Sequence, residues 1–178
     1  MGRSIGSTRR GRLFNLNDMS RSKKSYVPYM DNSSKILIYT FGTFPYKKEL
    51  SKFFGDYFVF GKLKRDFEDF ARLIVKDRPK LILGIARSTG NYSQFEKEAI
   101  NRFNKTGIIS RAGSSSYELY YPKKGYKSIG LSDKPTDSFC NWTMYKIAEY
   151  VNKLKIRSMF VHITGKDLKC LIEFLNEN

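Results

Sequence analysis

The chain contains one histidine and two cysteines, and two of these three residues could form a nucleophile and its base. Cys140 opens an apolar pattern typical of a helix, and His162 ends a strand-like run 22 residues later. A thiol attacks a carbonyl as its thiolate, and a histidine within hydrogen-bonding reach can take the thiol proton and later give it to a leaving amine. Because free N–H groups and the helix dipole at a helix N-terminus favour the anion, we expect a lowered pKa for the Cys140 thiol.

Spacing alone favours a simpler interpretation of Cys140, as a small apolar residue on the core face of its helix, since free cysteines are usually buried. The corresponding interpretation of His162 is a hydrogen-bonded histidine at the end of a strand. The second cysteine, Cys170, lies in an apolar stretch and is expected in the core. Two cysteines and one histidine fit no zinc-ligand spacing, so we expect no metal site.

The elements that must bring these residues together are predicted from the apolar pattern. Cys140 begins a spacing of 4, 3, 4 and 3 residues, which predicts a helix over 138–154 with Ser138 or the residue before it as N-cap. His162 falls in a predicted strand over 158–163. Further buried strands are predicted over 35–41, 57–60 and 81–86, and further helices over 47–54, 65–77 and 167–175.

Strands that alternate with helices predict an α/β fold with a βαβ unit and a right-handed crossover. Ligands in such folds bind at the carboxyl ends of the strands, so we expect a site near the loops after Phe41 and Ala86. Between residues 90 and 137 the pattern is weaker. Short strands fit 117–121 and 126–131, and 95–103 fits either a helix or a strand edge. The helix over 167–175 is expected to turn four residues inward: Leu168, Leu171, Ile172 and Leu175.

The formal charge of +16 is the strongest compositional signal. Residues 1–34 carry seven basic and two acidic residues and no apolar period, so we expect a flexible basic arm before one domain over 35–178. Such a charge attracts polyanions non-specifically, although a solvated basic surface explains it as well. No apolar run is long enough to cross a membrane or to form a secretory signal, so we expect a cytoplasmic protein with reduced thiols.

Four segments and one short turn, which follow the family's order along the chain, resemble the pyroglutamyl peptidase I family of cysteine peptidases. Residues 138–145 (Ser-Phe-Cys-Asn-Trp-Thr-Met-Tyr) are similar to the family's cysteine motif, and 159–163 (Met-Phe-Val-His-Ile) to the strand that supplies its catalytic histidine. Residues 96–101 (Glu-Lys-Glu-Ala-Ile-Asn) resemble the segment whose first Glu completes the triad. Residues 36–44 resemble its first strand and loop, and Gly84 to Ala86 match a small-residue turn. The resemblance covers about residues 35 to 178 and implies a mixed central sheet between helices in a three-layer architecture.

The resemblance implies a catalytic triad of Cys140, His162 and Glu96, with Glu98 as the competing carboxylate. It also implies that Phe41 and Phe44, three residues apart, hold the pyroglutamyl ring. The sequence departs from the family pattern at three places. Pro45 and Tyr46 replace a Gly-Gly pair. A functional arginine of the family falls near Thr106, and Lys105 or Arg102 could substitute for it. The interval from Glu96 to Cys140 is shortened to 44 residues.

The function implied by this resemblance is removal of an N-terminal pyroglutamyl residue from a peptide, without a metal or an organic cofactor. The peptide is the expected partner, and association into a homo-oligomer is left open. Two alternatives remain. One is a catalytically inactive or re-purposed relative that binds a modified peptide end, which the altered Gly-Gly and Arg positions favour. The other is a basic nucleic-acid-associated protein that uses the arm and the charge of the body.

Overall fold

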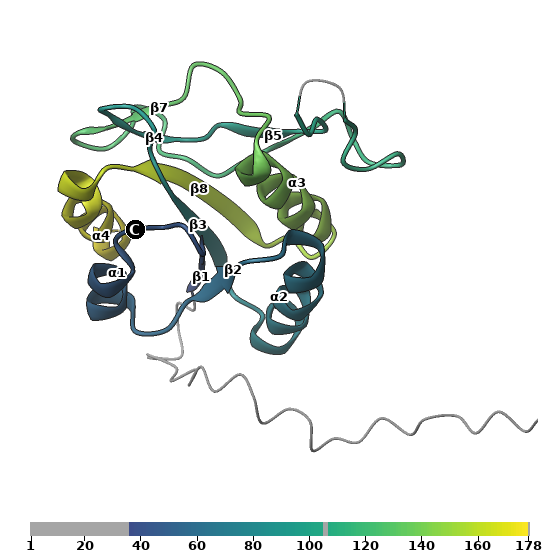
Figure 1. Ribbon diagram of the computed structural model, residues 1–178, viewed down its shortest axis with the longest axis horizontal. Coiled ribbons are helices and arrows are strands. Elements are labelled where there is room, and N and C mark those ends of the chain that lie inside the picture. Colours follow the sequence, from purple (N-terminus) through teal and green to yellow (C-terminus); the bar gives the residue numbers. More distant parts are fainter. Residues whose placement is uncertain (1–35, 105–106, 178) are drawn as a thin grey trace, which may run out of the picture.

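The computed structural model describes residues 36–104 and 107–177, so the expected basic arm, residues 1–34, lies outside the described part. A central six-stranded sheet has the strand order β2-β1-β3-β8-β4-β7 (Figure 1). Its strands are β1 (Ile36–Phe41), β2 (Phe58–Phe60), β3 (Leu81–Arg87), β4 (Ser93–Phe95), β7 (Ile129–Leu131) and β8 (Arg157–Ile163). A separate pair consists of β5 (Glu98–Ile100) and β6 (Ser116–Glu118).

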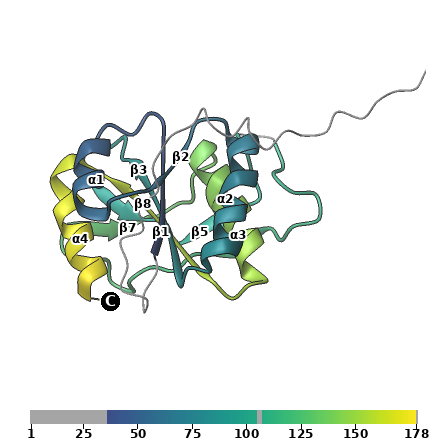
Figure 2. The same cartoon turned by 90° about the horizontal axis from the view of Figure 1, so that it is seen from below.

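The sheet is mixed. The four strands β2, β1, β3 and β8 are parallel neighbours, and β4 runs antiparallel to β8 while pairing in parallel with β7. Helices cover both faces, with α1 (Lys47–Phe54) and α4 (Leu168–Glu177) on one side and α2 (Leu63–Asp77) and α3 (Phe139–Asn152) on the other (Figure 2). The predicted α/β fold, a mixed sheet between helices in three layers, is confirmed.

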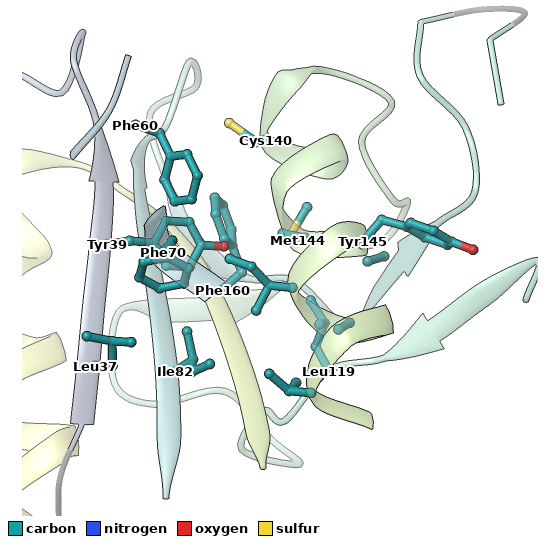
Figure 3. Close-up of a cluster of buried hydrophobic side chains, with 14 of the residues drawn as sticks. Leu37, Tyr39, Phe60, Phe70, Ile82, Leu119, Cys140, Met144, Tyr145 and Phe160 are labelled. Carbon is teal, nitrogen blue, oxygen red and sulfur yellow. The ribbon is translucent and has the colours of Figure 1, made fainter. Parts of the chain in front are cut away.

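Alternation along the strands explains why helices are needed on both faces. Leu37 and Tyr39 of β1 pack with α2 and α3, whereas Ile38 between them packs with α1 and α4. Successive side chains of a strand point to opposite faces, so an uninterrupted apolar run requires cover on both. Figure 3 shows the cluster on the α3 side, where Tyr39, Phe70 and Phe160 lie together below Cys140.

A glycine allows this cluster to close. Gly84 of β3 sits where an added Cβ would lie 2.3 Å from a ring atom of Phe160 and 2.4 Å from the ring and hydroxyl of Tyr39. No side chain fits there. The close approach of the two rings over the β3 backbone therefore depends on this residue.

The long elements match their predictions within a few residues. The helix expected over 138–154 ends at Asn152, and the one expected over 65–77 begins at Leu63. In the last helix, Leu168 and Leu171 are buried, and Ile172 and Leu175 pack half-buried against the same core, as expected. Phe174, which was not expected to point inward, is buried as well. Cys170 is half-buried rather than a core residue. A short 3-10 turn, Gly165–Asp167, precedes this helix.

Between residues 90 and 137, the described part of the chain forms four short strands, and no α-helix lies among these described residues. Residues 95–103 form the end of β4 and all of β5, so the strand-edge interpretation is the correct one. The strand expected over 117–121 is β6, which begins one residue earlier and ends at Glu118, and β7 occupies only the last part of the stretch expected over 126–131. Among the described residues, no helix is long and apolar enough to cross a membrane.

Candidate active site

Cys140 lies in the first turn of α3, where its backbone is held by a capping residue. The Ser138 side chain accepts a hydrogen bond from the Cys140 N–H at 3.3 Å, as expected for a helix N-cap. Thr136 Oγ1 donates a hydrogen bond to Ser138 Oγ at 3.0 Å and so holds the capping side chain in place. The regular helical ladder starts with the Trp142 N–H, which donates to the Ser138 carbonyl at 3.1 Å.

The thiol of Cys140 is protonated at rest. Burial raises its pKa to about 12, and this outweighs the lowering effect of the hydrogen bond with Ser138. The negative charge of Glu96 acts in the same direction as burial. The prediction of a lowered pKa at the helix N-terminus is therefore wrong, because only 5% of Cys140 is exposed and the thiolate would lose its hydration. A nucleophilic Cys140 needs a base that removes its proton.

The neighbouring residue, Asn141, anchors this turn of the helix to the second sheet. Its Oδ1 accepts from the Ile100 N–H at 3.0 Å, and its Nδ2 donates to the carbonyls of Ile100 at 2.8 Å and Arg102 at 2.6 Å. Asn141 is fully buried, and these three bonds satisfy both the oxygen and the nitrogen of its side-chain amide. The anchor fixes α3, and with it Cys140, relative to β5.

His162 and Glu96 are brought together by two antiparallel strands. His162 lies in β8 opposite Gln94 of β4, and the Glu96 N–H donates to the Phe160 carbonyl at 2.9 Å. His162 Nδ1 and Glu96 Oε1 are 2.7 Å apart. A carboxylate accepts from Nδ1–H, so the tautomer that this contact favours leaves Nε2 as an acceptor. Glu98 belongs to β5, opposite Glu118, so the carboxylate that meets His162 is that of Glu96.

The carboxylate of Glu96 is itself almost completely buried, with 1% of its side chain exposed. Gln94 Nε2 donates to Glu96 Oε1 at 3.1 Å, so one oxygen serves both the imidazole and the amide. Among the described residues, the other oxygen, Oε2, has no hydrogen-bond partner. Gln94 was not identified from the sequence, although its place two residues before Glu96 in a strand puts both side chains on one face.

His162 and Cys140 lie on the same face of the sheet. The His162 ring packs against Phe160 with 5.1 Å between ring centroids, and Phe160 and Cys140 belong to the cluster on the α3 side. Ala86, the register partner of His162 on β3, lines a pocket together with Cys140. His162 and Glu96 are thus in contact, and Cys140 lies on the same face of the sheet and lines the pocket beside the carboxyl end of β3.

The pocket beside Cys140 has a volume of about 390 Å³. Buried residues form its base: Phe41, Phe44, Ala86 and Cys140. Exposed residues form its rim: Thr43, Arg87, Thr89 and Phe139. It lies at the loops after β1 and β3, the place expected from the topology. Arg87 and Phe139 were not identified from the sequence as site residues, although Arg87 directly follows Ala86 and Phe139 directly precedes Cys140.

Phe41 and Phe44 both line this pocket but are held by different neighbours. Phe41 meets Phe139 edge to face at 5.1 Å between centroids, and Phe44 meets Tyr46 in the same way at 5.5 Å. The first ring belongs to the core cluster of α2 and α3, the second to that of α1 and α4. The pocket therefore opens at the carboxyl ends of β1 and β3, between the helix layer of α2 and α3 and that of α1 and α4.

Of the two substitutes expected for the arginine, the one that the structure describes, Arg102, does not line this pocket. Arg102 is exposed, and its carbonyl accepts from Asn141. Lys105 and Thr106 lie outside the described residues. The cation present at the pocket is Arg87, the last residue of β3.

A network of hydroxyls around Asp167 joins the two strands that carry His162 and Glu96. Oδ2 of Asp167 accepts from Ser93 at the start of β4 and from Thr164 just after β8, each at 2.6 Å, and Oδ1 accepts from Ser128 at 2.6 Å. Burial by itself raises the pKa of Asp167, but the three hydroxyl bonds together lower it below its usual value. Across the described part of the chain, no cluster of histidine, cysteine and carboxylate side chains could hold a metal ion.

A second and larger hollow, of about 540 Å³, lies between the N-terminal ends of α2 and α3. Its lining includes Lys62, Arg65, Phe103 and Trp142. Because it contains none of Cys140, His162 and Glu96, its size does not make it the reaction site.

Comparison with known proteins finds the fold but no sequence relative. No protein-family model and no curated protein matches the chain. Among solved structures, pyroglutamyl peptidase I from Bacillus amyloliquefaciens is similar, with a TM-score of 0.62, 17% identity, and cover of 80% of this chain and 91% of that chain. Pyrrolidone carboxyl peptidase from Thermococcus litoralis is also similar, with a TM-score of 0.59, 18% identity, and cover of 73% and 76%.

A mutant pyrrolidone carboxyl peptidase from Pyrococcus furiosus gives a TM-score of 0.58 at 15% identity and covers 81% of this chain and 86% of that chain. At such identities the likeness establishes the fold. The resemblance read from the four sequence segments is therefore confirmed for the fold, which the chain shares across most of its length with these peptidases.

Proposed function

We propose that the protein is a cysteine peptidase that removes N-terminal pyroglutamyl residues from peptides, with Cys140 as nucleophile, His162 as base and Glu96 as the group that orients His162. The observation that carries the proposal is the 2.7 Å contact between His162 Nδ1 and Glu96 Oε1, on the sheet face that Cys140 shares and next to the pocket that Cys140 lines. The fold shared with known peptidases of this kind supports it.

The pocket suits a flat, uncharged ring. Its base is formed mainly by Phe41 and Phe44, two rings that are 4% and 2% exposed. A pyroglutamyl ring would lie against these apolar walls, with its acyl carbonyl directed toward Cys140. The volume of about 390 Å³ admits a five-membered ring and the start of the peptide that follows it.

The first chemical step forms a thioester. His162 Nε2 takes the thiol proton as Sγ of Cys140 attacks the carbonyl carbon of the pyroglutamyl residue, which avoids a free thiolate in a site where burial raises the thiol pKa to about 12. N–H groups of the first turn of α3, which precede the helical ladder, would donate to the oxyanion. Collapse of the intermediate breaks the C–N bond, and His162 gives its proton to the leaving amine.

The second step releases pyroglutamate. A water molecule attacks the thioester, with His162 Nε2 now accepting its proton, and the thiol returns to Cys140. Throughout, Glu96 accepts from Nδ1–H, so that Nε2 stays available as an acceptor and the imidazolium that forms is stabilised.

The decisive experiment measures release of a coumarin from a pyroglutamyl-coumarin amide under reducing conditions. We expect turnover by the wild type, loss of turnover in Cys140→Ala and His162→Ala, and retention in Cys170→Ala, which removes the other thiol. Absence of turnover in the wild type, or turnover that survives Cys140→Ala, would exclude the peptidase. Binding of a pyroglutamyl peptide by an inactive wild type would instead identify a re-purposed binding protein with the same pocket.

A further inference from the structure

The pocket beside Cys140 changes in character from its base to its rim. The base is apolar and at most 5% exposed at each of its four residues, Phe41, Phe44, Ala86 and Cys140. The rim consists of the exposed residues Thr43, Arg87 and Thr89 and the Phe139 ring, which is 45% exposed. A substrate bound with its ring in the base must leave the pocket past these rim residues.

Arg87 is held at the rim by the strand and the turn around it. It is the last residue of β3 and pairs with Ile163 of β8, and the next N–H, that of Ser88, donates to the Ile163 carbonyl at 2.9 Å. Ser88 Oγ donates to the Tyr92 carbonyl at 2.6 Å and accepts from the Gly90 N–H at 3.2 Å. The backbone that carries Arg87 and Thr89 is therefore fixed from both sides of the turn.

The charge of Arg87 is not neutralised within the described structure. None of the residues that line the pocket is acidic, and in the part of the chain that the structure describes no carboxylate forms an ion pair with Arg87. Its guanidinium offers five donors in a planar fork, which suits a carboxylate. The hydroxyls of Thr43 and Thr89 on the same rim add further donors of hydrogen bonds.

We propose that Arg87 makes the site selective for peptides with an acidic residue directly after the pyroglutamyl residue. This inference rests on the proposed function, because it assumes that the ring occupies the base. The residue after the scissile bond then emerges at the rim, where Arg87 receives its carboxylate. Because Arg87 is exposed and its ion pair is screened by water, we expect a preference of about two- to fivefold for Glu over Gln at that position.

The test compares two peptides that differ only in this residue, pyroglutamyl-Glu-Ala amide and pyroglutamyl-Gln-Ala amide. Their dissociation constants are measured on Cys140→Ala protein by calorimetry at low ionic strength, and their kcat/KM values on the active protein. Both measurements are repeated after Arg87→Gln is introduced, once into the Cys140→Ala protein and once into the active protein. The control is Arg72→Gln, which removes the same charge from the exposed face of α2, away from the pocket.

We expect a preference for the Glu peptide in the parent protein and in Arg72→Gln, and this preference should shrink at high salt. In Arg87→Gln the ratio of the two affinities should fall to about one. Equal affinities in the parent, a preference that survives Arg87→Gln, or no binding of either peptide would overturn the inference. The coumarin assay separates this outcome from failure of the proposed function, since its leaving group carries no carboxylate. An inactive protein that still binds the Glu peptide through Arg87 would support the anion site alone.

Discussion

His162 Nδ1 and Glu96 Oε1 lie 2.7 Å apart across the antiparallel pair of β8 and β4. The register Gln94 to His162 and Phe95 to Val161 continues to Glu96 and Phe160, so residues 94, 96 and 162 share one face of the sheet. Only 1% of the Glu96 side chain is exposed, and water therefore weakens this contact little. The position of the imidazole is set by the sheet rather than by a loop.

Replacement of Glu96 by Gln tests what this contact contributes. An amide oxygen still fits between the imidazole and Gln94, but it carries no charge to stabilise an imidazolium, and its NH₂ group can favour the wrong tautomer. We expect kcat for the pyroglutamyl-coumarin substrate to fall on the order of 10²–10⁴-fold, with little change in KM. The matched control is Glu98→Gln, which alters a half-buried carboxylate of β5 and is expected to retain kcat. Equal losses in both variants would contradict the role of Glu96.

The high pKa of Cys140 makes a prediction about its reactivity. Burial raises the pKa from 9.0 to about 12, so below pH 9 the thiolate fraction is on the order of 10³-fold smaller than for an ordinary thiol. In Cys170→Ala protein we expect slow alkylation of Cys140 by iodoacetamide at pH 7, with a rate that rises about tenfold per pH unit. Mass spectrometry of samples quenched over time measures it. Rapid labelling at pH 7 with a flat pH profile would show a resting thiolate instead.

The long elements could be predicted because each carries its own signal. The apolar runs of β1, β3 and β8 and the helical spacing after Cys140 do not depend on knowing their partners. Cys140 and His162 stood out because the chain contains so few residues of their types. The choice of Glu96 came from its resemblance to a family segment, and spacing alone did not separate it from Glu98.

The remaining features depend on pairing and burial, which a single sequence does not display. The strands β4 to β7 have three residues each, too short for a periodic signal, and form only against neighbours such as β8. The pKa of Cys140 was predicted in the wrong direction because the sequence shows a helix N-terminus but not the burial that outweighs it. The place of Arg87 at the pocket also follows from tertiary packing.

Asn141 is expected to contribute to stability more than its place beside the nucleophile suggests. Asn141→Ala removes three hydrogen bonds and takes their side-chain partner from the Ile100 N–H and the Arg102 carbonyl, while the Ile100 carbonyl still accepts from the Arg102 N–H at 2.7 Å. We expect a loss of about 2–4 kcal/mol in the free energy of unfolding, measured by urea denaturation. Asn152→Ala, at the exposed end of the same helix, is the control and should change it by less than about 0.5 kcal/mol. A similar small loss for both would refute the anchoring role.

Gly84 is predicted to tolerate no side chain. In Gly84→Ala the new methyl group would stand 2.3 Å from Phe160 and 2.4 Å from Tyr39, so both rings must move. We expect destabilisation of about 1–3 kcal/mol and a lower melting temperature by calorimetry. Gly130→Ala, in β7, provides the comparison, since its added Cβ meets only the Ser93 carbonyl oxygen at 3.9 Å. Equal melting temperatures for the two variants would show that the ring cluster is looser than its packing indicates.

The hydroxyl network of Asp167 predicts a specific dependence of stability on pH. The pKa of the Asp167 carboxyl is lower in the folded state than in the unfolded state, where it is about 3.9. The ionised carboxylate therefore stabilises the folded protein fully above a pH of about 3.9, and this stabilisation is lost as the pH falls through the folded-state pKa. Asp167→Asn should destabilise the protein by about 1–3 kcal/mol at pH 7, and the difference from the wild type should shrink below pH 4. Ser128→Ala, which removes one donor but keeps the carboxylate, should lose less at pH 7. Unfolding free energies from urea titrations at pH 2.5 to 7 measure this. A difference that stays constant over that range would show that the Asp167 charge does not stabilise the junction of β4 and β8.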